Sequence, residues 1–156
     1  MARMVDISRK PDVRRRAVAS GDLVLSRKTI RAIHEGRVEK GDPLATAEVA
    51  ALQAVKRVWE VLPHCHPIPI TRAGVRFSVA GDHVRCTCEV EATYKTGVEM
   101  EALYGCTVGL LTVWDMVKSL EKDARGQYPR TRLVDVRVVS KEKSRPGPGA
   151  RRRKPF

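Results

Sequence analysis

Hydrophobic positions at helical spacing predict two helices in the first half of the chain. Ahead of them, the pattern shows only a short apolar run that ends at Leu25. Ser26 is a suitable N-cap for a helix over residues 27–35, and Asp42 is one for a second helix that begins with a proline. Pro63 ends this second helix. Its apolar residues recur every three or four positions: Leu44, Ala47, Ala51, Val55, Val58 and Leu62.

The middle of the chain changes to the residue types of β-strands. Residues 68–79 and 83–94 are rich in β-branched residues, and the Ala-Gly-Asp turn between them predicts an antiparallel hairpin. A long helix is predicted over residues 98–123, and alternation over residues 133–139 predicts a final strand. The order helix, helix, hairpin, helix, strand indicates an α+β fold with helices packed on one face of an antiparallel sheet.

The long helix combines an apolar body, which we expect to be buried on nearly all sides, with charged side chains near its two ends. Glu99 and Glu101 lie in its first turn, whereas Asp115 and Lys118 share a face near its end. Charges in such an apolar helix are costly unless they are paired or used. The alternative to an active site is an ion pair that only supports the structure, with both glutamates stabilised by the helix dipole.

A rigid segment with histidine and cysteine side chains precedes the hairpin. Prolines at both ends of Pro63-His64-Cys65-His66-Pro67 keep it out of a helix, and histidine can bind phosphate or transfer a proton near neutral pH. The spacing does not match a zinc site, and we expect His64 and His66 to point to opposite sides, so no metal site is predicted. The other cysteines are expected to be small buried hydrophobic residues: Cys86, Cys88 and Cys106.

The positive charge is concentrated at the two ends of the chain. The 156 residues contain 30 Lys and Arg against 18 Asp and Glu, a formal net charge of +12 that favours anionic partners. Residues 1–16 carry +4 and residues 141–156 carry +6, which leaves +2 for the rest. Residues 144–156 have the composition of a disordered basic tail, so residues 1–143 are predicted to be a single domain.

Two basic features within the predicted domain are candidates for anion binding. Lys40 stands just before the second helix, where a cation and free backbone amides together suit a phosphate, although the glycine spacing of a Walker loop is absent. Arg14, Arg15 and Arg16 fit a phosphate clamp, a nucleic-acid contact or a disordered arm, and composition does not decide among these.

Composition also excludes several classes of protein. The longest uncharged apolar stretch, residues 102–114, is too short to span a bilayer, and the basic N-terminus lacks the apolar region of a signal peptide. The cysteines form no disulfide framework, so a reducing, cytoplasmic location is expected. The chain has no Asn and only two Gln, a depletion of thermolabile amides that favours a hot habitat.

Several motifs in a fixed order resemble one family, the cyclic pyranopterin monophosphate synthases, or molybdenum cofactor biosynthesis protein C (MoaC). The similarity extends from about residue 4 to residue 143. Its most specific part is Gly-Val-Glu-Met-Glu-Ala-Leu at residues 97–103, followed by Asp-Met-Val-Lys at residues 115–118. The other matching segments are Met4 to Ser8, Gly36 to Asp42 and Cys65 to Pro67.

The resemblance implies a ferredoxin-like fold and a hexamer, a trimer of dimers with active sites between subunits. It implies conversion of (8S)-3′,8-cyclo-7,8-dihydroguanosine 5′-triphosphate into cyclic pyranopterin monophosphate, with release of pyrophosphate, in molybdenum cofactor biosynthesis; no cofactor is expected. By position, the resemblance assigns catalysis to Asp115, Lys118 and Lys40. It assigns substrate binding to the remaining candidates, His64, Cys65, His66, Glu99, Met100, Glu101 and Arg15.

The residue types suit that chemistry. Asp115 and Lys118 can divide the proton transfers, while Lys40, His66 and Arg15 can neutralise charge on phosphate oxygens. The competing prediction is a small basic nucleic-acid-binding protein without catalysis that uses its two charged ends. That alternative explains the net charge but not the acidic residues of the long helix, and aromatic residues for base stacking are scarce. A nucleotide-derived small molecule, rather than nucleic acid or a membrane, is therefore the expected partner.

Overall fold

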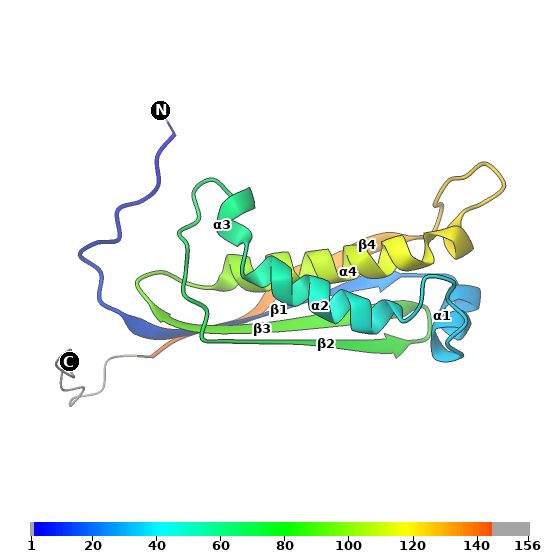
Figure 1. The fold of residues 1–156 in the computed structure, drawn as a ribbon, viewed down its shortest axis with the longest axis horizontal. Coiled ribbons are helices and arrows are strands. Elements are labelled where there is room, and N and C mark those ends of the chain that lie inside the picture. Colours follow the sequence, from blue (N-terminus) through cyan, green and yellow to red (C-terminus); the bar gives the residue numbers. More distant parts are fainter. Residues whose placement is uncertain (1, 145–156) are drawn as a thin grey trace.

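The computed structural model describes residues 2–144, in which helices cover one face of an antiparallel sheet (Figure 1). The four strands lie in the order β2-β3-β1-β4, and each neighbouring pair is antiparallel. This arrangement confirms the predicted ferredoxin-like α+β fold. Along the chain the elements are β1 (Val13–Val24), α1 (Arg27–His34), α2 (Pro43–Val55), α3 (Val58–Val61), β2 (Arg72–Ala80), β3 (His83–Tyr94), α4 (Glu99–Glu121) and β4 (Arg132–Lys143).

Strand β1 is an inner strand that the hydrophobic pattern did not predict. It pairs with β3 along its whole length, from Val13 opposite Tyr94 to Val24 opposite His83, and with β4 on its other edge. Its signal is weak because two of the residues that face the helices are alanines, while arginines occupy part of the opposite face. The interpretation of Arg14–Arg16 as a disordered arm is therefore wrong, since all three lie in this strand.

The helix predicted to end at Pro63 is broken into two. Helix α2 ends at Val55, and Arg57, with φ −122°, precedes the single turn of α3. The break brings Val58 into the core at 1% exposure, whereas Trp59 stays 48% exposed.

Both predicted caps are confirmed, because Ser26 Oγ accepts from the amide of Thr29, and Asp42 Oδ1 accepts from the amides of Leu44 and Ala45.

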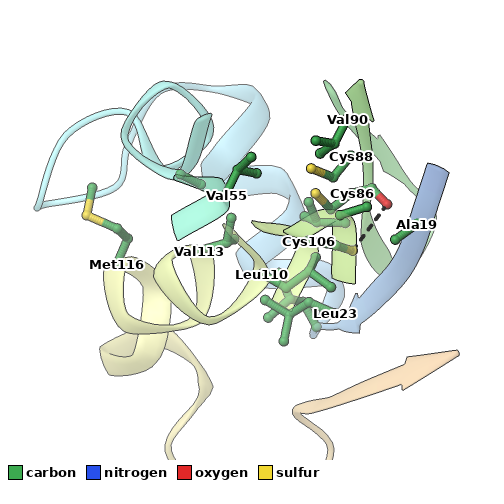
Figure 2. Packing of buried hydrophobic residues seen from close by; sticks show 14 of the residues in the cluster. Ala19, Leu23, Val55, Cys86, Cys88, Val90, Cys106, Leu110, Val113 and Met116 are labelled. Atoms are coloured by element: carbon green, nitrogen blue, oxygen red, sulfur yellow. Dashed lines mark hydrogen bonds between the residues drawn. The ribbon is translucent and has the colours of Figure 1, made fainter. Parts of the chain in front are cut away.

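The core lies between α4, α2 and the helix-facing side of the sheet (Figure 2). The three cysteines predicted to be buried are fully so, and the Cys106 thiol donates to the carbonyl oxygen of Cys86 at 3.8 Å. Helix α4 is less enclosed than predicted, since Leu111 is 55% and Met100 38% exposed. The sheet and α2 cover only one side of this helix.

Gly105 lets α4 approach α2 and β3 closely, because a Cβ atom there would lie 2.5 Å from Val55 Cγ2 and 2.9 Å from Cys88 Sγ. We expect Gly105→Ala to lower the free energy of unfolding by about 2 kcal/mol, since overpacking outweighs the better helix propensity of alanine. Chemical denaturation would measure the change. Gly74→Ala is the control, because its added methyl group would meet no atom within 4 Å. A Gly105→Ala protein as stable as the wild type would contradict this packing.

The open face of the sheet carries ion pairs between strands. Arginines on β1 and β3 neutralise carboxylates on β1, β3 and β4, at distances of 2.7 to 3.0 Å: Arg14 with Glu91, Arg16 with Glu89 and Glu142, and Arg85 with Asp22. Arg14 and Arg16 are thus paired with carboxylates of this chain, whereas the Arg15 guanidinium donates to main-chain carbonyl oxygens.

Residues 2–144 contain no helix long and apolar enough to cross a membrane. The predicted basic tail, residues 144–156, lies outside the described residues except for Ser144.

Candidate active site

The predicted site residues form two groups near opposite ends of α4. The first, the lysine cluster, consists of Lys40, Asp115 and Lys118. The second, the carboxylate cluster, surrounds a small cavity at the start of α4 and includes His64, Cys65, His66, Glu99, Met100 and Glu101. Asp115 follows Glu99 by sixteen positions in the same helix, a rise of about 24 Å. One chain therefore holds the two clusters well apart.

Asp115 is the centre of the lysine cluster. Its Oδ1 accepts from Lys118 Nζ at 2.7 Å, as expected for residues on one helix face, and its Oδ2 accepts from Lys40 Nζ at 2.9 Å. Lys40 also donates to the main-chain oxygen of Asp115 at 3.0 Å. The loop between α1 and α2 carries Lys40 to this place, with Gly36 and Gly41 at positive φ on either side of it.

The electrostatics of the lysine cluster separate the roles of its members. The hydrogen bonds from Lys118 and Lys40 lower the pKa of Asp115 to about 2, so this carboxylate is ionised at neutral pH. The hydrogen bond to Asp115 raises the pKa of Lys118, which is therefore protonated. Asp115 can accept a proton and Lys118 can donate one, which is the division of labour that acid–base chemistry requires.

A purely structural role explains this cluster poorly. The side chains of Lys40, Asp115 and Lys118 are 45%, 56% and 44% exposed. Ion pairs this exposed typically contribute little to stability. Their position at the surface instead leaves both lysines accessible to an anionic ligand.

The carboxylate cluster encloses a cavity of about 110 Å³ between the start of α4 and the segment after Pro63. Glu101 is only 4% exposed, and the Oε2 atoms of Glu99 and Glu101 have no hydrogen-bond partner among residues 2–144. Buried carboxylate oxygens without a partner are costly, which marks them as acceptors for a ligand. The cavity is small beside the several hundred Å³ of a typical ligand pocket.

Burial sets the protonation of this cluster. It raises the pKa of Glu101 to about 7, and the charge of Glu99 acts in the same direction. Burial also raises the pKa of Cys65, with the two glutamates adding to the effect, so this cysteine is a neutral thiol at neutral pH. For Glu99, burial is outweighed by the hydrogen bond from Lys141 and by the helix amide, and its pKa is lowered.

Lys141 is a candidate site residue that the sequence analysis missed. Its Nζ lies 2.5 Å from Glu99 Oε1, although 42 positions separate the two residues. Pairing of β4 with β1 places it there, opposite Ala17, and no local motif signals this contact. Arg15 joins the same end of the molecule, where its guanidinium donates to the carbonyl oxygens of Tyr94 and Lys95.

The segment after Pro63 departs from one expectation. His64 and His66 both border the cavity, rather than facing opposite sides, because the segment has no strand geometry to impose alternation. Within residues 2–144, no three His, Cys, Asp or Glu side chains are placed to hold a metal ion.

Comparison with known proteins connects this geometry to one family. A relative from Pyrococcus abyssi is 55% identical over 142 residues, which are 91% of this chain and 89% of that protein, and is named a probable cyclic pyranopterin monophosphate synthase. A relative from Halobacterium salinarum with the same name is 56% identical over 145 residues, 93% of this chain and 89% of that protein.

A third relative, from Methanothermobacter thermautotrophicus, is 52% identical over 141 residues, 90% of this chain and 89% of that protein. It is named a probable cyclic pyranopterin monophosphate synthase accessory protein. The family model described as the MoaC family matches residues 4–144. This chain belongs to the MoaC family.

Proposed function

We propose that this protein is a cyclic pyranopterin monophosphate synthase of molybdenum cofactor biosynthesis. Its substrate is (8S)-3′,8-cyclo-7,8-dihydroguanosine 5′-triphosphate, and its products are cyclic pyranopterin monophosphate and pyrophosphate. The observation that carries the proposal is the lysine cluster, where an ionised carboxylate and a protonated lysine meet at an accessible surface. Relatives that cover nine tenths of the chain and bear this name support it.

Each cluster suits a part of this reaction. Asp115 and Lys118 exchange protons with the purine-derived ring as it opens and rearranges. The substrate hydroxyl then bonds to the α-phosphorus while the bond to the bridging oxygen breaks and pyrophosphate leaves. Lys40, His66 and Arg15 neutralise charge on the phosphate oxygens. The unpartnered oxygens of the carboxylate cluster accept N–H groups from the nitrogen-rich ring.

The direct test is incubation of the purified protein with this substrate, followed by measurement of the pyranopterin product and of pyrophosphate. We expect both in equal amounts. The competing function, nucleic-acid binding without catalysis, predicts no turnover and tight RNA binding that is lost when residues 145–156 are deleted.

We further propose that the active site is shared between two subunits of a homo-oligomer, a hexamer built as a trimer of dimers. In one chain the clusters lie about 24 Å apart along α4, and the cavity beside Glu101 is too small for a nucleotide. A second copy of the chain that places its lysine cluster over this cavity brings the two kinds of cluster together and extends the space for the substrate. Residues 1–143 form the catalytic unit, and a cytoplasmic location follows from the same assignment.

Shared sites predict rescue between two inactive variants. Asp115→Asn and Glu101→Gln proteins, produced together with different tags, should recover about a quarter of the wild-type activity. Random pairing joins the two intact clusters in about one of four sites. Asp115→Asn with Lys118→Ala is the control, because both changes lie in the same cluster and no pairing restores it. No rescue in the first mixture would show that each site is built within one chain.

A further inference from the structure

A tight turn after α4 carries an aromatic residue back onto that helix. Asp123 Oδ1 accepts from the amides of Arg125 and Gln127 at 2.8 and 2.9 Å, and the amide of Asp123 donates to the carbonyl oxygen of Gln127 at 3.0 Å. Gly126 completes the turn at φ +73°. Gln127, which both accepts from and donates to Asp123, is followed directly by Tyr128, so these bonds fix the backbone from which Tyr128 extends.

The ring of Tyr128 packs against Trp114, the residue before Asp115. The two ring centroids are 5.6 Å apart and the planes meet at 79°, an edge-to-face contact. Both residues are half-buried, so the contact holds Tyr128 beside the lysine cluster. Residues 2–144 offer no hydrogen-bond partner to the Tyr128 hydroxyl, whereas Lys40, Asp115 and Lys118 are bonded to one another.

Trp114 and Lys118 are four residues apart on one face of α4, so the Tyr128 ring that packs against Trp114 lies on the face that carries Lys118. The pKa of Lys118 is raised by the hydrogen bond and the charge of Asp115. A phenol on the same side of α4 as the Lys118 ammonium group is a suitable further donor for an anion, because a phosphate oxygen has several lone pairs to share.

We propose that Tyr128 is a substrate-binding residue of the lysine cluster, whose hydroxyl donates a hydrogen bond to the phosphate group that Lys40 and Lys118 contact. The ring stays against Trp114 and holds the hydroxyl in place. This proposal rests on the proposed function, since it takes the anion at the lysine cluster to be a phosphate of the substrate.

The test compares Tyr128→Phe with the wild type by steady-state kinetics and by inhibition with inorganic triphosphate, a probe that carries the phosphates without the ring system. The Tyr128→Phe protein keeps the aromatic contact and loses only the hydroxyl. We expect the KM and the inhibition constant of triphosphate to rise by about tenfold, since a hydrogen bond to a charged group is lost. The kcat should stay within about twofold of the wild-type value, because the lost hydrogen bond stabilises the bound substrate and the transition state to the same extent.

Tyr104→Phe is the matched control, because Tyr104 lies on the same helix beside α2 and α3 and contributes to neither cluster. Its kinetics and inhibition should equal those of the wild type. Unchanged KM and inhibition in Tyr128→Phe would overturn the proposal, even if the melting temperature fell. In that case, loss of turnover in the Asp115→Asn protein would show that the lysine cluster is the active site but that Tyr128 does not bind the substrate there. Full turnover in the Asp115→Asn protein would show that neither the lysine cluster nor Tyr128 takes part in the reaction.

Discussion

Replacement of Lys118 by alanine is expected to lower kcat by 10²- to 10⁴-fold, the usual contribution of a positioned general acid. The Lys118→Ala change removes the proposed proton donor and one of the two cations that lower the pKa of Asp115. The fold should be unaffected, because the ion pair is 44% to 56% exposed and such pairs contribute little to stability. The measurement is the rate of pyrophosphate release from the cyclic dihydro-GTP substrate at saturating concentration.

Lys122→Ala is the matched control for this experiment. Lys122 is the C-cap residue of α4, four positions after Lys118, and it is exposed and has no ion pair among residues 2–144. Its removal changes the net charge by the same amount and should leave kcat within about twofold. Near-normal product formation by Lys118→Ala would show that the Asp115–Lys118 pair is only structural.

Glu101→Gln is expected to stabilise the protein against unfolding in a pH-dependent manner. Burial raises the pKa of Glu101 to about 7 from an ordinary value of 4.5, so the folded state retains a proton that the unfolded state releases between these values. The stability that this proton gives is complete below about pH 4.5 and is lost as the pH rises through 7. The stability of the glutamine variant does not depend on this proton, so above pH 7 the variant should be more stable than the wild type by roughly 3 kcal/mol.

Denaturation of both proteins at several pH values, at one protein concentration, would measure this difference. Glu121→Gln is a control for which the opposite change in the free energy of unfolding is expected. Glu121 is also buried, but hydrogen bonds from Thr131, Thr29 and Ser26 outweigh burial and lower its pKa. Glu121→Gln should therefore destabilise the protein at neutral pH, and the difference should shrink as the pH falls below about 4. A Glu101→Gln protein with the same pH dependence as the wild type would refute the assignment of a raised pKa.

The Glu101 carboxyl also bears on activity, because Glu101 borders the cavity at the start of α4. A group with a pKa near 7 can either hold or release a proton at physiological pH, whereas Asp115, with its pKa of about 2, is ionised there and serves only as a proton acceptor. Glu101 and Asp115 are thus in different protonation states for a physical reason: Glu101 is buried with no ion-pair partner among residues 2–144, whereas Asp115 is exposed between two lysines.

The sequence predicted most elements whose residues have strong local preferences. Ser26 and Asp42 are caps with local hydrogen bonds, and the Gly81 turn joins β2 and β3 as expected, with φ +45°. Strand β1 was not predicted, because the sheet buries it with alanines on one face and ion pairs on the other. The break before Val58 was missed for a similar reason, since it depends on the core that this residue enters.

By itself the sequence determined that Asp115 and Lys118 share a helix face, and it predicted which side chains carry the chemistry of the candidate site. Those features depend on residue identity and on the fixed geometry of a helix. Only the tertiary structure brought Lys40 to Asp115, Lys141 to Glu99 and Tyr128 to Trp114. It also separated the two clusters along α4. These contacts join residues far apart in the chain, and loop paths and strand pairing decide them rather than any local preference.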